Sequence, residues 1–261
     1  MSTPIRRILV AVDASPLSLA AAEAACSLAG RLGAQVEALF VEDINVVRLV
    51  AHPYVHTISF AAARRQSADD TLIGKALELQ MVAARRALDA ALEASGAHGA
   101  FAVRRGKVEA ELLAADHACD LLCLGWSGRA DPGSRPRLGS VARAVAGAAA
   151  GSVLLMQKSA AGPVCLWWDG NPRALAMATS LAARDGGAVQ VLVPATNRDA
   201  GTRLGQSALD ALAQTGLPAR ILAVGRPSTL LAALPAEAVL MLPAACGLAL
   251  DEIPCSTVVV R

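Results

Sequence analysis

The fold is decided by the stretch ILVAVDASP at residues 8–16. Its first five residues are apolar and lead to Asp13, as expected of a short buried strand that ends at the edge of a sheet. Ser15 and Pro16 then open a helical pattern, because Ser caps a helix N-terminus well and Pro is preorganised for the first helical turn. The stretch therefore predicts a strand that runs directly into a helix.

The same alternation of strand and helix continues outward from this stretch. The first helix is expected to end at about Leu32, before Gly33. Segment 42–66 is interpreted as irregular, and as a lid over the sheet edge. Five strands that alternate with helices are typical of an open parallel sheet with helices on both faces. The further strands are expected at 36–41, 101–103, 121–124 and 153–156, and the further helices at 67–94, 108–117 and from Ser140.

The second part of the chain repeats the first. The stretch VCLWWDGNP at 164–172 echoes residues 8–16 and places Asp169 where the first copy has Asp13. We expect two domains, 1–158 with a glycine-rich loop and 163–261 shortened and without it. Their fifth strands are expected to pair, so that two five-stranded sheets pack as an internal pseudo-dimer. A pairing of two whole chains is left open. The other pairs of similar segments in the two copies are 27–39 and 180–192, 106–113 and 225–231, 121–124 and 239–242, and 153–156 and 257–260.

Composition narrows the class of protein. Hydrophobic residues make up 54% and charged residues 18%, which favours a packed core over disorder. The longest uncharged apolar run, 144–156, is shorter than the roughly 18 residues that span a bilayer, and residues 1–7 lack a signal-peptide pattern. We therefore expect a cytoplasmic protein with no membrane partner. A net charge of +2 without a basic, aromatic-bearing stripe predicts no nucleic-acid binding. The six cysteines form no C-x-x-C pair and are interpreted as buried hydrophobes.

The strongest local signal for a site is a glycine-rich loop. Gly125 and Gly128 follow the fourth strand, and after ten residues Gly139 and Ser140 open a helix. Glycines let the backbone approach an anion, and the free N–H groups and dipole of a helix N-terminus attract phosphate. A plain turn with a serine at the helix start is the alternative reading. The loop and helix start have a local excess of three positive charges, from Arg129, Arg135, Arg137 and Arg143 against Asp131.

Two further residues are expected at the same edge, because the carboxyl ends of parallel strands converge there. Asp13 ends the first strand, where it could bond a ribose hydroxyl or help to hold a divalent metal on phosphates. It could equally begin a turn at the helix start. Val41 ends the second strand and could grip an adenine edge through its backbone, or simply end a buried strand.

These features together resemble the universal stress protein family. The resemblance rests on residues 8–13, 36–41 and 119–125, on the glycine constellation and on the closing strand; it covers 5–158 well and 163–261 more faintly. It implies a Rossmann-like fold of the adenine-nucleotide alpha-hydrolase type. Family members that bind ATP carry Gly-x2-Gly-x9-Gly-Ser/Thr, whereas this loop is one residue longer and contains two prolines. By resemblance, the nucleotide site is lined by Asp13, Val41, Gly125, Gly128, Gly139, Ser140 and Val141.

The functional expectation follows from this resemblance. We expect a stress-response protein that binds ATP in the first domain, with Mg²⁺ held only through the nucleotide and Asp13. It would act as a sensor or regulator without efficient catalysis, because no residue pattern places a general base against a water. Only Asp169 of the motif remains in the second domain, so no cofactor is expected there. The alternatives are an interaction module of the same fold that binds no nucleotide, and a slow ATP hydrolase.

Overall fold

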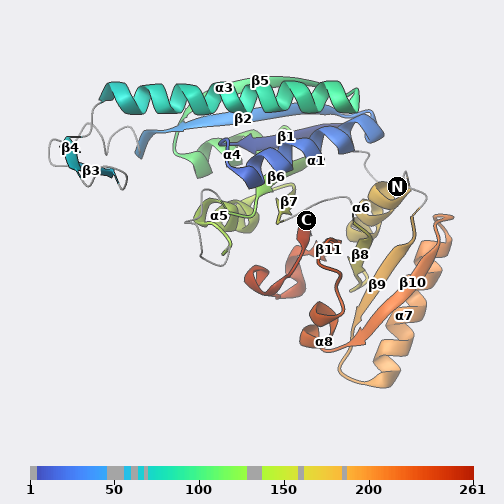
Figure 1. The fold of residues 1–261 in the computed structure, drawn as a ribbon. Helices are drawn as coiled ribbons and strands as arrows, with labels where there is room; N and C mark the ends of the chain where they lie inside the picture. Colours follow the sequence, from blue (N-terminus) through green and yellow to red (C-terminus); the bar gives the residue numbers. More distant parts are fainter. Residues whose placement is uncertain are drawn as a thin grey trace.

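The computed structural model (Figure 1) describes residues 5–45, 56–59, 64–67, 70–127, 137–157, 162–183 and 187–261. Within these ranges the chain forms one ten-stranded sheet covered by helices, and a separate two-stranded hairpin. The predicted α/β class with a mostly parallel sheet is confirmed.

The first half of the chain follows the predicted alternation closely. Ser15 caps the first helix by accepting a hydrogen bond from the Ser18 N–H, and Gly33 ends that helix in the left-handed conformation with φ 65°. The third strand is longer than predicted, because it stays paired with the second strand along its whole length. The elements are β1 (Arg7–Val12), α1 (Pro16–Leu32), β2 (Gln35–Asp43), α3 (Asp70–Ser95), β5 (His98–Gly106), α4 (Val108–Asp116), β6 (Leu121–Gly125), α5 (Ser140–Ala148) and β7 (Ser152–Met156).

The second half has the same order of strands but a shorter last connection. Residues 239–261, all of which the structure describes, hold two single 3-10 turns where the first half has a loop and α5. The elements are β8 (Val164–Trp167), α6 (Pro172–Ala182), β9 (Val189–Pro194), α7 (Arg198–Ala213), β10 (Ala219–Gly225), α8 (Pro227–Ala232), β11 (Val239–Pro243), η1 (Ala244–Cys246), η2 (Leu250–Glu252) and β12 (Ser256–Val260).

The two halves share one sheet. Its strand order is β10-β9-β8-β11-β12-β7-β6-β1-β2-β5. Neighbouring strands in each half are parallel, whereas β12 and β7 pair antiparallel with Val258 opposite Leu154. The fifth strands therefore meet as predicted, and their hydrogen bonds join the two five-stranded units into a single sheet. Figure 1 shows the blue-to-green half and the yellow-to-red half on either side of this junction.

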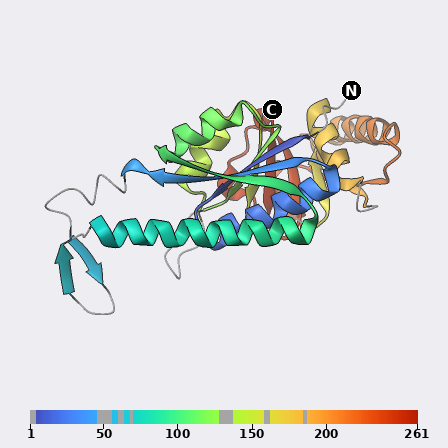
Figure 2. The same cartoon turned by 90° about the horizontal axis from the view of Figure 1, so that it is seen from above.

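Helices cover both faces of the sheet. On one face a continuous core joins α1, α3, α6 and α7, with Ala25 and Ala178 completely buried. On the other face α4 and α5 bury Leu112 and Val145 over the first half, and α8 buries Leu230 over the second. Figure 2 shows α1 and α3 on the side of the strands opposite α4 and α5.

The prediction of an irregular segment at 42–66 is wrong where the structure describes that segment. β2 continues to Asp43 because it remains paired with β5, and β3 (His56–Ser59) pairs antiparallel with β4 (Arg64–Ser67). Thr57 and Ile58 have the high strand propensity typical of β-branched residues, which favours this hairpin. The described residues of this segment lie outside the lining of the crevice described below, and the rest of the expected lid, 46–55 and 60–63, lies outside the described residues.

Two expectations from composition can be compared with the structure. Across the described ranges, no helix is both long and apolar enough to cross a membrane. All six cysteines lie in the described part of the chain and none of them forms a disulfide; four are buried. Their interpretation as small hydrophobic residues is confirmed for those four.

Candidate functional site

A crevice of about 280 Å³ opens at the carboxyl ends of β1, β2 and β6. The order of the strands reverses between β1 and β6, and this is where open parallel sheets bind their ligands. Six of the seven predicted site residues line it together, and the seventh, Gly128, lies outside the described residues. The lining residues are Ala11, Val12, Asp13, Ser15, Ser18, Leu39, Val41, Val108, Leu112, Leu124, Gly125, Ser127, Gly139, Ser140, Val141 and Ala142.

The N-terminus of α5 faces this crevice, and no side chain of the described residues caps its amides. Gly139 is the N-cap residue and has no side chain to accept a hydrogen bond from the first turn. The N–H groups of Ser140, Val141 and Ala142 have no intrahelical acceptor, because the first turn of any helix lacks one. By contrast, α1 and α6 are capped by the side chains of Ser15 and Asn171. The positive end of the α5 dipole is thus left open to an anion.

Both ends of the glycine loop are held in place. The Gly139 N–H donates to the Trp126 carbonyl at 2.9 Å, which closes the loop at its base, and the Trp126 ring is buried in the core. Gly125 packs directly against α1: a Cβ on it would lie 3.0 Å from the Leu17 carbonyl carbon and from the Ser18 nitrogen. A side chain at this position would require the backbone of α1 to give way by a few tenths of an ångström.

Asp13 combines a position at the crevice with a local structural role. Its Oδ1 accepts the Ser15 N–H at 2.9 Å, and its own N–H donates to Ser18 Oγ at 3.2 Å. Ala14 between them has φ 59°, in the left-handed region. The carboxylate therefore shapes the turn from β1 into α1, as one of the two readings predicted. The side chain is also exposed on the crevice wall.

Val41 lies one residue beyond the paired part of β1 and β2, whose register ends with Val12 opposite Phe40. On its other side Val41 remains paired with Arg104 of β5. The side of β2 that faces β1 is therefore free at the rim of the crevice, as a backbone contact with a ligand would require.

Sequence reasoning missed part of the wall. Val108 and Leu112 of α4 add apolar surface beside Leu39. Ser127 is buried and its Oγ has no hydrogen-bond partner among the described residues, although it lines the crevice. Its place between Gly125 and Gly128 in the motif is the signal that could have identified it. An unsatisfied hydroxyl at the edge of a cavity is suited to a polar ligand.

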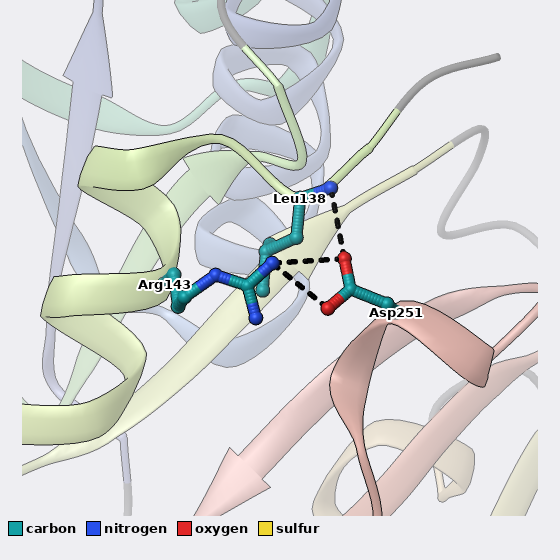
Figure 3. Close-up of polar contacts among 3 residues, drawn as sticks. All are labelled: Leu138, Arg143 and Asp251. Atoms are coloured by element: carbon teal, nitrogen blue, oxygen red, sulfur yellow. Dashed lines mark hydrogen bonds and ion pairs between the residues drawn. The ribbon is translucent and has the colours of Figure 1, made fainter.

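The two described arginines of the predicted positive cluster, Arg137 and Arg143, do not line the crevice. Arg143 instead pairs with Asp251 of the second half, at 2.8 Å from Oδ2 (Figure 3). Arg143 is not part of the crevice lining, to which α5 contributes Ser140, Val141 and Ala142. Arg137 is exposed and is not part of the lining. Arg129, Arg135 and Asp131 lie outside the described residues.

Asp169 in the second half forms the same turn as Asp13. Its Oδ1 accepts the Asn171 N–H at 2.9 Å, and Asn171 in turn caps α6. The helix N-terminus that would complete a site is missing, because η1 follows β11 directly. The absence of a ligand at the second half stays a prediction.

The sequence profile of the Universal stress protein family matches residues 4–157. No curated protein matches the chain.

Solved structures share the fold over nearly the whole chain. A universal stress protein from Archaeoglobus fulgidus is 15% identical, with 98% of each chain covered and a TM-score of 0.71. A functionally unknown protein from Pseudomonas aeruginosa is 15% identical over 98% of this chain and 92% of its own, with a TM-score of 0.56. A universal stress protein in complex with cAMP is 22% identical over 59% of this chain and 98% of its own; its TM-score of 0.38 carries no argument about this crevice.

Proposed function

The chain belongs to the universal stress protein family, and from this premise we propose that it is a stress-response protein that binds ATP in the crevice of its first half. The uncapped amides of Ser140, Val141 and Ala142 would receive the phosphates. The apolar wall formed by Leu39 and Leu112 would hold the base, with the Val41 backbone at its edge.

One observation carries this proposal: a helix N-terminus without a cap opens into a cavity that is otherwise mostly apolar. Such a cavity offers little to a small inorganic anion, because its apolar surface would remain unfilled. A purely apolar ligand would leave the amides of α5 and the Ser127 hydroxyl without partners. A nucleotide satisfies both regions.

Binding without efficient turnover fits the side chains of the crevice. Asp13 is the single carboxylate among the described lining residues, and no histidine or lysine lines it in the same ranges. Because Asp13 Oδ1 already accepts the Ser15 N–H, it is poorly placed to act as a general base. We therefore propose a sensor or regulator, with Mg²⁺ entering only with the nucleotide. Phosphate release from ATP at the background rate would agree with this role.

The test is a charge placed at the start of α5. Ser140→Asp puts a carboxylate where the phosphates would lie, and an acidic residue in the first turn favours the helix itself. Isothermal titration with ATP should show affinity reduced by about tenfold or more, equivalent to roughly 1.4 kcal/mol. The matched control is Ser228→Asp, which makes the same change in the first turn of α8, at an exposed position outside the crevice.

Unchanged ATP binding by Ser140→Asp would place the nucleotide elsewhere. Equal losses in both variants would indicate a general effect of negative charge. AMP and cAMP belong in the same titration, because weaker binding of ligands with one phosphate would show that the α5 amides read the phosphate chain.

Two observations favour a second candidate function, an interaction module that binds no nucleotide. Arg143 is engaged by Asp251 instead of facing the crevice, and Leu79 of α3 is 70% exposed on the surface. Chromatography of the supernatant after denaturation of the purified protein separates the two candidates. Copurified adenine nucleotide supports the first, whereas its absence together with no ATP binding in titration supports the second.

A further inference from the structure

The antiparallel junction brings the last connection of the second half to the crevice edge of the first half. Because β12 runs opposite to β7, the start of β12 lies beside the end of β7. Beyond the paired residues, hydrogen bonds continue between the segment after β7 and the segment before β12. The Gln157 N–H donates to Ser256 Oγ at 3.1 Å, and Gln157 Nε2 donates to the Ile253 carbonyl at 3.0 Å. The residues just before Ser256 are therefore fixed against the first half.

Among these residues, Asp251 reaches the closing end of the glycine loop (Figure 3). Its Oδ1 accepts the Leu138 N–H at 3.3 Å and an Arg143 Nη2–H at 3.0 Å, and its Oδ2 lies 2.8 Å from the same nitrogen. Leu138 directly precedes the N-cap residue of α5, and Arg143 lies one turn into that helix. One carboxylate thus holds the loop and the helix on both sides of the uncapped amides.

The backbone that carries Asp251 is anchored by apolar packing. Leu250 packs against the core under α4 and α5 and also against the core of the second half. Ile253 is buried in the core of the second half. An acid fixed in this way loses little conformational freedom when it pairs, so its contacts are worth more than those of a free surface pair.

We propose that Asp251 is a positioning residue, through which the second half orients the start of α5 and so sets the affinity of the first half's crevice for its phosphate-bearing ligand. The second half has no α5 of its own, and the shortened connection that replaces it serves the site of the other half. The effect on affinity rests on the proposed function, whereas the effect on the loop does not.

The experiment compares Asp251→Ala, Asp251→Asn and Glu252→Ala in the full chain. Glu252 is the matched control, because it is the next residue, is equally acidic and is exposed. Asp251→Ala should weaken ATP binding about fivefold. Asp251→Asn keeps an acceptor for the Leu138 N–H but loses the charge, and should fall between the wild type and Asp251→Ala. Glu252→Ala should bind as the wild type does.

Hydrogen exchange of the Gly139 amide provides a readout that needs no nucleotide. This amide donates to Trp126, not to Asp251, so its exchange reports closure of the loop. It should exchange about fivefold faster in Asp251→Ala, and the thermal midpoint should change little. In 1 M salt the differences in affinity and exchange between the wild type and Asp251→Ala should shrink, since screening weakens exposed ion pairs.

The outcomes separate this proposal from the proposed function. If the wild type binds ATP, unchanged affinity in Asp251→Ala overturns the positioning role. If the wild type binds no ATP, the proposed function fails, and Gly139 exchange alone then decides: faster exchange supports the positioning role, and unchanged exchange overturns it. A fall in thermal midpoint with no change in exchange or affinity would make Asp251 merely structural and would also overturn it.

Discussion

The carboxyl ends of the two half-sheets begin alike and then diverge. In each, an aspartate lies just after the first strand and accepts the N–H of the residue two positions on, and a helix with proline in its first turn follows. Beyond the fourth strand the first half continues into a glycine loop and α5, whereas the second half forms two short turns. The first therefore has a crevice that ends at a helix N-terminus, and the second lacks that helix.

This difference between the halves distinguishes the features that the fold requires from those that ligand binding requires. The aspartate turn persists in a half that has lost the loop and helix, so its role in starting a helix does not depend on a ligand. The uncapped α5 is present only where the crevice is, which is expected if its amides serve binding. The same comparison indicates that Asp13 alone is weak evidence for a nucleotide, and that the pairing of Gly139 with an open helix start is the stronger evidence.

The largest effect should come from Gly125→Val, which removes the close contact between β6 and α1. The new Cβ would lie 3.0 Å from backbone atoms of Leu17 and Ser18, so α1 must shift away from the crevice. We expect a loss of stability on the order of 1–3 kcal/mol and no measurable ATP binding. Chemical denaturation and titration measure the two effects.

Gly147→Ala is the control for that change, because a Cβ on this exposed α5 residue meets no atom within 4 Å. Alanine should stabilise the helix by roughly 0.5–1 kcal/mol without altering binding. If Gly125→Val bound ATP as the wild type does, the close contact at the end of the fourth strand would not be needed for the ligand site that distinguishes the first half from the second.

A smaller effect is expected from the paired variants Asp13→Ala and Asp169→Ala. Each loses one turn hydrogen bond, and the free energy of unfolding should fall by about 0.5–1.5 kcal/mol in both. Only Asp13→Ala should change ATP affinity or its dependence on Mg²⁺. Equal ATP affinity in the two variants would show that Asp13 does not contribute to the nucleotide site. A much larger loss of stability in one variant would show that the two turns are not equivalent.

The smallest difference between the halves should appear in the reactivity of their thiols. Burial raises the pKa of Cys26 to about 11 and that of Cys165 to about 12. At pH 8 both thiols stay protonated as well as inaccessible, so alkylation by iodoacetamide requires local opening. Because one sheet joins the halves, we expect similar protection for the two residues, measured by mass spectrometry. Much faster labelling of Cys165 would show that the second half opens by itself.

The same thiols predict how stability depends on pH. Their pKa values are raised in the folded state, so their contribution is present below the ordinary value of 9.0 and is lost as pH rises through about 11 for Cys26. The denaturation midpoint should therefore decrease more between pH 8 and pH 10 for the wild type than for Cys26→Ala.

Most of the fold was predictable because its signals are local. The apolar run before Asp13, the cap at Ser15 and the stop at Gly33 place β1 and α1 from neighbouring residues alone. The echo of residues 8–16 at 164–172 predicted a second set of strands. The pairing of β3 with β4 was missed, since four-residue strands give little periodicity. The pairing of the two fifth strands, between residues about 100 positions apart, was predicted from the internal repeat and not from local patterns.

The site was predictable as a set of positions but not in its electrostatics. Six predicted residues line one crevice, because glycines and strand ends are set by backbone geometry. The direction of Arg143 was not predictable, since its partner Asp251 lies 108 residues away in sequence. Ser127 lies between two glycines of the motif, but the feature that marks it as a site residue, a buried hydroxyl without a partner among the described residues, is visible only in the structure.

The missing helix between β11 and β12 has a consequence for how the protein would respond to its ligand. Two identical subunits, each with a crevice, could bind two ligands and influence one another. Here the unlike halves are fused in one polypeptide, so the proposed site occurs once per chain. Within a single chain, occupancy would rise with concentration as a simple hyperbola at a one-to-one ratio, a graded readout and not a threshold switch.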